Sequence, residues 1–153
     1  MKNISKKDIF FVGTQLVLFL FYVIPTPAYQ LKYDSKIAED FFFIITLIGI
    51  LLIGISLLLL NKNLTPFPTP KQNGELIKTG VYKTIRHPIY TGIILTTFFY
   101  ALYSHGLLKI GIAIILFILF YFKSKYEESL LLKKFPDYYN YTKHTYRFFP
   151  FIM

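Results

Sequence analysis

The sequence contains no cysteine and few charged residues. Without cysteine, disulfide scaffolds, thiol catalysis, and zinc or iron–sulfur sites with cysteine ligands are excluded. Charged residues make up 16% of the 153 positions, well below the roughly 25% that is usual in soluble domains. Acids are especially scarce: 8 Asp and Glu stand against 17 Lys and Arg, for a formal net charge of +9. The chain is therefore basic overall, yet poor in the charge that covers a soluble surface.

Apolar residues dominate the composition instead. They form 54% of the chain, aromatic residues form 20%, and the mean hydropathy is +0.49. A soluble domain of this length cannot bury so much apolar surface, and disorder requires low hydrophobicity. A positive net charge often indicates nucleic-acid binding, but in so apolar a chain it favours an anionic membrane surface. The length fits one domain, so we expect a single membrane domain over residues 1–153.

Four apolar stretches, residues 9–24, 41–60, 89–103 and 106–122, predict the fold. The second is long enough to cross a hydrocarbon core of about 30 Å at 1.5 Å per residue. One helix over the last two stretches would measure about 52 Å, so the polar break at residues 104–106 predicts a helical hairpin. We expect an all-α integral membrane bundle of four transmembrane helices, in which the last two form this hairpin, with a cytoplasmic C-terminal cap.

The first stretch has a second interpretation. A basic start at Lys6 and Lys7 followed by an apolar middle is also typical of a secretory signal peptide. No cleavage site of the A-x-A kind follows it, however, whereas three further apolar stretches do. The sequence therefore favours a retained first helix over a cleaved signal.

The distribution of Lys and Arg predicts the orientation in the membrane. If the chain crosses four times, all 17 of these residues except Lys32, Lys36 and Lys109 fall on the side of the N-terminus. Short loops that are rich in Lys and Arg stay in the cytoplasm. We therefore expect a multi-pass protein in the lipid bilayer with both termini cytoplasmic.

Two segments are expected on the cytoplasmic side, residues 61–88 and 123–153. The first contains Pro66, Pro68 and Pro70, which block a regular helix. The second alternates aromatic and basic residues, which suits a segment at headgroup level. Stacking on nucleic acid is the competing interpretation, but aromatic residues run through the apolar stretches as well. We therefore expect no nucleic-acid partner, and no spacing of histidines and carboxylates predicts a metal site.

Polar residues gather at two places, residues 80–92 and residues 123–128. The first group supplies cations, an imidazole and phenols, and the second supplies the paired carboxylates Glu127 and Glu128. A hairpin returns the chain to the side it left, so the two groups are expected to be neighbours that could hold a zwitterionic ligand. Simple anchoring at the membrane surface is the alternative, and there the carboxylates would pair with lysines such as Lys123.

Motifs in the second half of the chain resemble those of a known family. Residues 80–92 read Gly-x-Tyr-x-x-x-Arg-His-Pro-x-Tyr-x-Gly, and a hydrophobic hairpin, Glu-Glu at 127–128 and Arg-Phe-x-Pro-Phe at 147–151 follow. Three prolines at 66, 68 and 70 and Leu-Ile-x-x-Gly at 76–80 precede these motifs. All of them occur in order over residues 65–153. This pattern resembles the membrane methyltransferases typified by isoprenylcysteine carboxyl methyltransferase, whose relatives include phospholipid methyltransferases.

The resemblance implies both a function and a site. The methyl donor would be S-adenosylmethionine, bound at the cytoplasmic face without a Rossmann fold, and the chain indeed has no G-x-G-x-x-G. The acceptor would be lipophilic or linked to a lipid. Arg86 and His87 would act in catalysis, with Lys123 near the acceptor. The implied cofactor-binding residues are Leu76, Ile77, Tyr82, His87, Pro88, Ile89, Tyr90, Glu127 and Glu128.

Three departures from the family pattern leave the acceptor open. Lys123 stands where family members carry arginine, and it offers a point charge instead of a bidentate fork. Pro136 replaces the usual glycine after Phe135, and the G-x-G element of the phospholipid type is missing. Lipid headgroups, small thiols, carboxylates of fatty acids or isoprenoids, and quinone-like molecules all remain possible acceptors.

The acceptor route is predicted from small residues. Gly49, Gly54, Gly92 and Gly111 permit close helix approach or a lateral opening. We therefore expect a lipid acceptor to enter between residues 41–60 and the hairpin.

Two other functions compete with methyl transfer. A nicotinamide-dependent membrane reductase is one, because sterol reductases resemble this C-terminal region distantly, although they use more spans. A non-catalytic membrane protein that retains the scaffold, or a small transporter subunit, is the other. Binding of S-adenosylhomocysteine, of NADPH or of neither separates the three.

Overall fold

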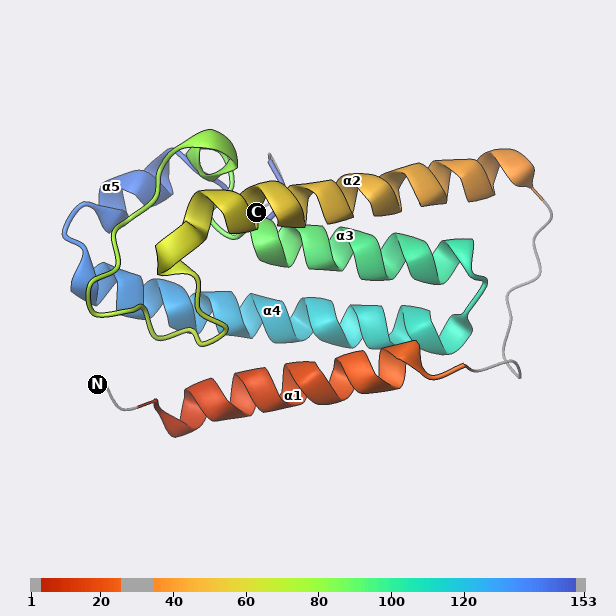
Figure 1. Ribbon diagram of the computed structural model, residues 1–153, viewed down its shortest axis with the longest axis horizontal. Coiled ribbons are helices and arrows are strands. Elements are labelled where there is room, and N and C mark those ends of the chain that lie inside the picture. Colours follow the sequence, from red (N-terminus) through yellow and green to blue (C-terminus); the bar gives the residue numbers. More distant parts are fainter. Residues whose placement is uncertain (1–3, 26–34, 151–153) are drawn as a thin grey trace.

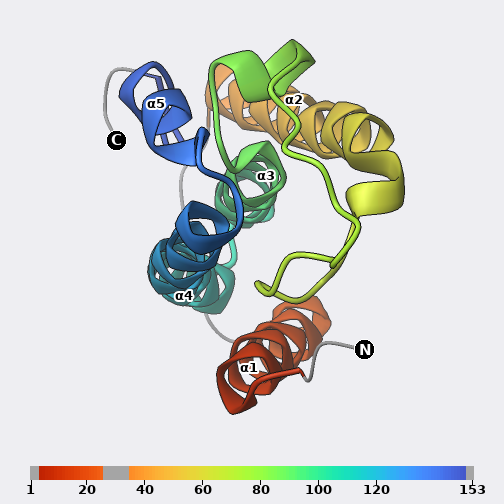
Figure 2. The same ribbon diagram turned by 90° about the vertical axis from the view of Figure 1, so that its left-hand side faces the viewer.

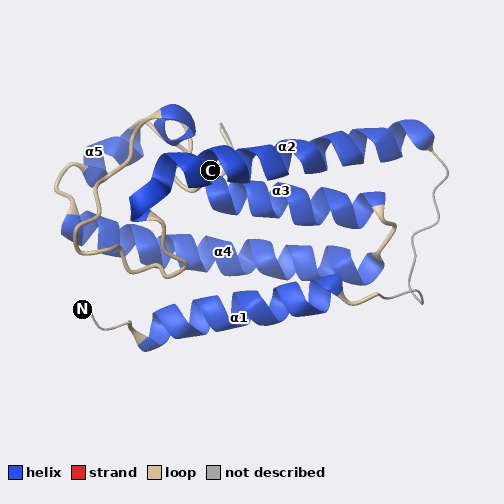
Figure 3. Ribbon diagram, in the orientation of Figure 1, coloured by secondary structure: helices blue, strands red, loops and turns tan. Residues whose placement is uncertain are grey.

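The chain is helical throughout the part that the computed structural model describes, residues 4–25 and 35–150 (Figures 1 and 3). No strand occurs within those ranges. Their α-helices are α1 (Lys6–Val23), α2 (Lys36–Leu60), α3 (Pro88–Tyr103), α4 (Leu107–Lys134) and α5 (Tyr138–Lys143). Two short 3₁₀-helices, η1 (Asn61–Asn63) and η2 (Gly80–Lys83), lie between α2 and α3.

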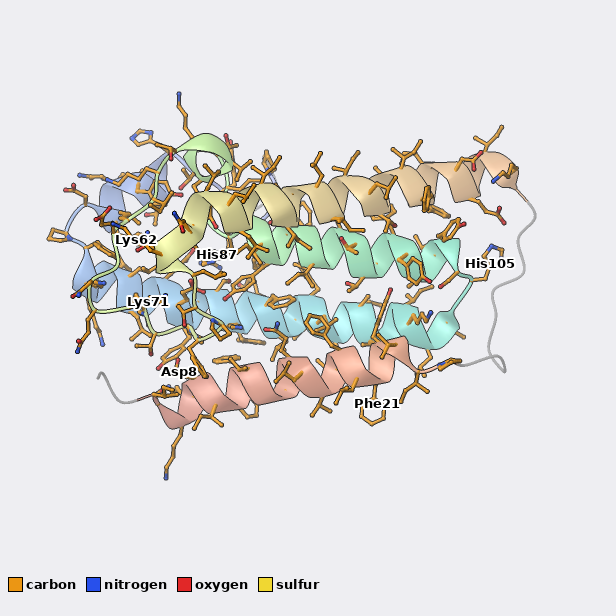
Figure 4. All side chains as sticks on the ribbon, viewed as in Figure 1. Asp8, Phe21, Lys62, Lys71, His87 and His105 are labelled. Atoms are coloured by element: carbon orange, nitrogen blue, oxygen red, sulfur yellow. The ribbon has the colours of Figure 1, made fainter. Side chains whose placement is uncertain are left out.

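Each predicted apolar stretch forms a helix, and the helices expose apolar side chains. Among the described helices, α2 and α4 are long and apolar enough to cross a membrane, whereas α3 is apolar but shorter. Leu58 on α2 is 80% exposed, and Phe21 on α1 points away from the other helices (Figure 4). An apolar outer surface of this extent marks a protein that meets lipid.

Helix α4 is longer than the apolar stretch predicted. It continues past Phe122 through the charged residues to Lys134. Lysines in its last turn favour this extension, because cations stabilise the C-terminal end of a helix. The carboxylates of Glu127 and Glu128 therefore stand on a regular helix, which holds their directions fixed.

The long helices pack in the order α2, α3, α4, α1 (Figure 2). Helices α2 and α3 meet most closely at Gly49 and Gly92. A Cβ atom added to Gly92 would lie 2.7 Å from the carbonyl oxygen of Gly49, and one added to Gly49 would lie 2.9 Å from that of Gly92. Backbones this close leave no opening at that level. Of the two predicted alternatives for Gly49 and Gly92, the close helix approach is therefore confirmed, and there is no lateral opening at their level. Gly54 and Gly111 border open space instead of a neighbouring helix.

The turn between α3 and α4 lies where the polar break predicts it. Helix α3 ends at Tyr103 and α4 begins at Leu107, and His105 between them takes a left-handed conformation with φ of 57°. Nε2 of His105 lies 3.2 Å from the carboxylate of Glu39 on α2. This turn forms the end of the bundle away from His87 (Figure 4).

The segments outside the bundle gather at its other end, together with the start of α1 (Figures 1 and 2). We call residues 64–87 and 135–150 the end segments. The part with the three prolines forms no helix, as predicted. Asp8, which completes a capping box with Ser5, is fully buried and accepts hydrogen bonds from the Thr69 hydroxyl (2.7 Å) and backbone N–H (3.2 Å). The proline-containing loop is thereby tied to the first turn of α1.

The C-terminal end segment packs into the protein. Backbone N–H groups of Arg86 and His87 donate to the carbonyls of Tyr146 and Arg147, at 2.8 and 3.1 Å. Phe148 is completely buried in the core formed by apolar residues of α3 and α4. The prediction of a tail lying at headgroup level is therefore wrong for Phe148, because its ring fills the core.

Candidate active site

The two polar groups of the sequence become neighbours, as the hairpin predicts. Pro88 is the first residue of α3 and His87 is its N-cap. The fixed φ of proline suits a first turn, and its missing N–H is not needed there. This start places Arg86 and His87 directly before the helix, and Tyr90 on its first turn, facing α4.

Glu128 is the centre of a buried ion network. Its Oε1 accepts a hydrogen bond from Arg86 Nε at 2.8 Å and lies 3.2 Å from Nε2 of His87. Its Oε2 accepts from Arg147 Nη2 at 2.5 Å, and the side chain is 10% exposed. The hydrogen bond to Glu128 raises the pKa of Arg147. Both oxygens of Glu128 are therefore occupied by groups of the protein itself.

Arg86 joins this network to the C-terminal end segment. Its Nη1 donates to the backbone carbonyls of Thr142 and Thr145, and to the Thr145 hydroxyl at 3.3 Å. The guanidinium thus links Glu128 of α4 to the end of α5 and to Thr145 just after it. Its contacts within the described structure hold the fold of the site together.

Glu127 faces a different region. The Tyr90 hydroxyl donates to its Oε2 at 2.7 Å, and Nδ1 of His87 lies 3.8 Å from the same oxygen. The side chain is 25% exposed, and none of the described residues donates a hydrogen bond to Oε1. Within the described residues, Oε1 of Glu127 is therefore open to a further hydrogen-bond donor.

An aromatic stack fixes the imidazole between the two carboxylates. The His87 ring lies parallel to the Tyr90 ring, with 5.3 Å between centroids and 5° between planes. Tyr90 in turn stacks on Phe120 of α4, at 4.8 Å and 16°. The stack directs one ring nitrogen of His87 to Glu128 and the other to Glu127.

A cavity of about 270 Å³, here named the larger cavity, opens beside this stack. All four long helices contribute to its wall, including Gln15 of α1, Leu57 of α2 and Ile93 of α3. The predicted site residues that line it are Tyr82, Arg86, His87, Pro88, Ile89, Tyr90, Lys123 and Glu127. Both apolar and charged groups therefore face the same space.

A second cavity of about 110 Å³, the smaller cavity, adjoins the first below the proline-containing loop. Leu76 and Ile77 line it, as do Tyr138 and Tyr141 from α5. The residues common to both cavities are Leu60, Thr65, Tyr82, Arg86 and Glu127. The two spaces therefore meet at Tyr82, Arg86 and Glu127.

The phenol of Tyr82 at this meeting point is a neutral group. Burial raises the pKa of Tyr82, and it raises that of the nearby Tyr141 to about 12. The Tyr141 hydroxyl donates to the backbone carbonyl of Tyr82 at 2.5 Å, which holds η2 against α5. Both phenols remain protonated at neutral pH, so they act as hydrogen-bond donors.

The predicted cofactor residues all line one or both cavities, with one exception. Glu128 lines neither of them, because it is enclosed by Arg86, His87 and Arg147. Of the residues predicted for catalysis, Arg86 and His87 lie side by side, and Lys123 is on the wall of the larger cavity.

Lys123 does not form the surface pair with Glu127 that simple anchoring predicts. Its Nζ donates to the side-chain oxygen of Gln15 at 2.8 Å and to the carbonyl of Pro66 at 3.1 Å. The residue is 2% exposed. The anchoring interpretation is therefore wrong for this lysine.

Sequence reasoning missed two residues of the site. Arg147 belongs to a motif of the tail, yet its partner Glu128 lies on another element, so spacing alone does not connect them. Gln15 carries a simpler signal, because it is an amide within the uncharged stretch of residues 9–24. A polar side chain in such a stretch is a candidate functional group.

Fold and site together indicate a membrane protein with two adjoining cavities at one end of its helices. Among the described residues, no cluster of three His, Cys, Asp or Glu could hold a metal ion. The phospholipid methyltransferase family matches residues 9–138, from α1 to the first residue of α5, and the chain belongs to this family. Its class of activity is therefore methyl transfer at a membrane. A comparison with curated proteins found no match.

Proposed function

We propose that the chain transfers a methyl group from S-adenosylmethionine to a membrane-associated or lipophilic acceptor at the cytoplasmic membrane face. The observation that carries this proposal is the pair of adjoining cavities that meet at Tyr82, Arg86 and Glu127. One lies below a polar loop, and the other reaches apolar residues of α2 and α3. A water-soluble donor and a lipid acceptor require this kind of double access.

The residues present fit S-adenosylmethionine. Taken together, the two cavities reach the range of about 300–1,000 Å³ that is typical of small-molecule sites. Leu76, Ile77 and Tyr82 would hold its apolar and aromatic parts, and the available oxygen of Glu127 its cationic or hydroxyl groups. When bound, the donor supplies a methyl group on a positively charged sulfur.

The protein contributes position and exclusion of water to such a reaction. Methyl transfer from a sulfonium is an in-line displacement, so alignment of the reactants lowers the barrier most. The stack of His87, Tyr90 and Phe120 gives the larger cavity a rigid wall. A carboxylate or thiolate acceptor needs no base, whereas an ammonium acceptor must lose a proton, and His87 is the imidazole at this wall.

We further propose four membrane spans with both termini in the cytoplasm. The end segments and the charged part of α4 carry most of the Lys and Arg, and such segments remain cytoplasmic. Because the chain has no native cysteine, single cysteines at Lys36 and Lys71 can be labelled without background. They should react from opposite sides of intact cells, and labelling from the same side would contradict the topology.

Calorimetric titration of S-adenosylhomocysteine into the purified protein tests the activity. Binding supports the proposal, a preference for NADPH indicates a reductase, and binding of neither indicates a non-catalytic protein. Incubation with labelled donor and a total membrane extract then identifies the acceptor from the labelled product.

A further inference from the structure

A further cavity, of about 310 Å³, lies among the end segments. It opens between η2 and α5, which lie side by side (Figures 1 and 2) because the Tyr141 hydroxyl holds η2 against α5. We call this cavity the basic hollow, and its lining consists of Lys78, Lys83, Asp137, Asn140, Tyr141, His144 and Thr145. None of the site residues predicted from the sequence lines it, so the hollow is a different place from the candidate active site.

Most of the polar side chains of the basic hollow are open to a further partner. Asp137 is the one carboxylate in its lining, and its Oδ2 lies 3.8 Å from Nζ of Lys78. The side chains of Lys83, Asn140 and His144 form no hydrogen bond or ion pair with any described residue. An ammonium group, an amide and an imidazole therefore face the hollow with their hydrogen-bonding capacity unused within the described structure.

This set of groups suits a phosphate. Two lysines against one aspartate leave an excess of one positive charge in the hollow, which favours an anion. A phosphate monoester carries up to about two negative charges and three strong acceptor oxygens. Lysines bind phosphate as point charges, and the amide of Asn140 and the imidazole of His144 can donate to the oxygens that remain. The basic hollow thus offers both the charge and the donors that a phosphate requires.

The basic hollow also lies beside the end of a helix that meets lipid. Helix η2 begins at Gly80, where an added Cβ atom would lie 2.6 Å from Cδ1 of Leu59 on α2. Helix α2 ends at the next residue, Leu60, and Leu58 in this turn is an exposed apolar side chain. Lipid headgroups and their phosphates lie where an apolar span ends. This position favours a phosphate that belongs to a membrane lipid.

We propose that the basic hollow binds the phosphate group of an anionic membrane lipid at headgroup level. Lys78 and Lys83 supply the positive charge, and Asn140 and His144 donate hydrogen bonds to the phosphate oxygens. The lipid chains continue along the exposed apolar surface of α2. This site goes beyond the proposed methyl transfer and does not depend on it. A soluble phosphate offers the same chemistry, and the choice of probes separates the two sources.

Three probes test the site: dioctanoyl phosphatidic acid, dioctanoylglycerol and inorganic phosphate. Their binding to the full chain is measured calorimetrically in a neutral detergent. An exposed ion pair corresponds to at most about fivefold in affinity, so two lysines should make phosphatidic acid bind about 10-fold more tightly than dioctanoylglycerol. Tighter binding of phosphatidic acid than of inorganic phosphate supports a lipid ligand. Equal binding of these two, or no preference for phosphatidic acid over dioctanoylglycerol, overturns the proposal.

A double variant places the phosphate at the lysines. Lys78→Gln combined with Lys83→Gln should weaken the binding of phosphatidic acid about 10-fold. Lys6→Gln combined with Lys133→Gln is the matched control, because it removes the same charge at exposed positions outside all three cavities. It should leave the binding within about twofold, since distant exposed charges are screened by salt. An equal loss in both double variants shows a diffuse attraction of a basic protein and overturns the proposal.

Asp137→Asn is the decisive variant, because its expected effect has the opposite sign. The carboxylate neutralises Lys78 and repels an anion, so its removal should strengthen the binding of phosphatidic acid by about two- to fivefold. The fold should tolerate the change, since the side chain is 81% exposed and makes no capping hydrogen bond with α5. Unchanged or weaker binding would show that the phosphate does not lie beside Lys78 and would overturn the proposal.

Binding of S-adenosylhomocysteine is measured in parallel to separate the two proposals. The Lys78 and Lys83 double variant should bind it as the native chain does, because neither lysine lines the larger or the smaller cavity. A loss of both ligands would show that the lysines act through the fold at Tyr141, which lines the hollow and the smaller cavity, and would overturn the lipid site. If the native chain prefers phosphatidic acid but binds no S-adenosylhomocysteine, the lipid site stands and the methyltransferase proposal fails.

Discussion

Two adjacent carboxylates on α4 belong to two different regions of the molecule. Glu128 lies in the buried ion network with Arg86, His87 and Arg147, whereas Glu127 lies at the meeting point of the two cavities. Successive residues of an α-helix point about 100° apart, so a Glu-Glu pair supplies one carboxylate to each region. The difference shows that a paired-acid motif can place one carboxylate in a structural ion network and the other on the wall of a cavity.

Neutralising Glu128, the buried carboxylate, should have the largest effect on the stability of the fold. Glu128→Gln leaves Arg86 and Arg147 without their counter-charge. Breaking a buried ion pair by removing one partner destabilises a protein by about 3–5 kcal/mol. Chemical or thermal unfolding in detergent measures the loss. Glu127→Gln is the matched control on the next residue, and an equal loss in both variants would erase the distinction between the two regions.

Neutralising Glu127, the carboxylate at the cavities, should instead affect ligand binding. Glu127→Gln should weaken S-adenosylhomocysteine binding by about 1.5–3 kcal/mol, the value of a hydrogen bond to a charged group. The unfolding transition should change little, because Glu127 has one hydrogen-bond donor among the described residues, Tyr90. Asp40→Asn, at the far end of α2, is the control for removing one negative charge. Unchanged affinity in Glu127→Gln would remove the reason for placing the donor at this carboxylate.

Removing the hydroxyl that orients Glu127 should have the smallest effect. Tyr90→Phe keeps the stack with His87 and Phe120 but frees the carboxylate to change its direction. The loss of one hydrogen bond corresponds to about 0.5–1.5 kcal/mol, and we expect it in S-adenosylhomocysteine affinity, measured by the same titration. If Tyr90→Phe weakened binding more than Glu127→Gln, the phenol itself and not the carboxylate would be the main contact.

The helices could be located from the sequence because long apolar stretches indicate them directly. The hairpin turn at residues 104–106 and the helix start at Pro88 follow from polar and proline signals. The continuation of α4 to Lys134 was beyond such reasoning. Hydropathy falls after Phe122, although the Lys, Glu and Leu residues that follow still favour a helix. The apolar pattern therefore indicates only the part of α4 that meets lipid.

The site could be predicted in part, because a hairpin returns the chain to its starting side. This argument brings His87 and Tyr90 to Glu127 without knowledge of any side-chain direction. It does not separate Glu127 from Glu128, since that needs the rotation of α4 about its axis. The contacts of Gln15 with Lys123 and of Arg147 with Glu128 depend on how α1 and the end segments pack, which no local pattern encodes.

Arg147 leaves the ribosome after α1 to α4 have all been synthesised. The ion network around Glu128 therefore cannot be complete before these helices have been synthesised, because its last member belongs to the strand-like backbone pairing of residues 84–87 with residues 146 and 147. Arg147, which donates to Oε2 of Glu128, is thus the last member of the network to be added to the chain. A chain that ends before Arg147 would contain α1 to α4 in its sequence but would lack the group that occupies Oε2 of Glu128.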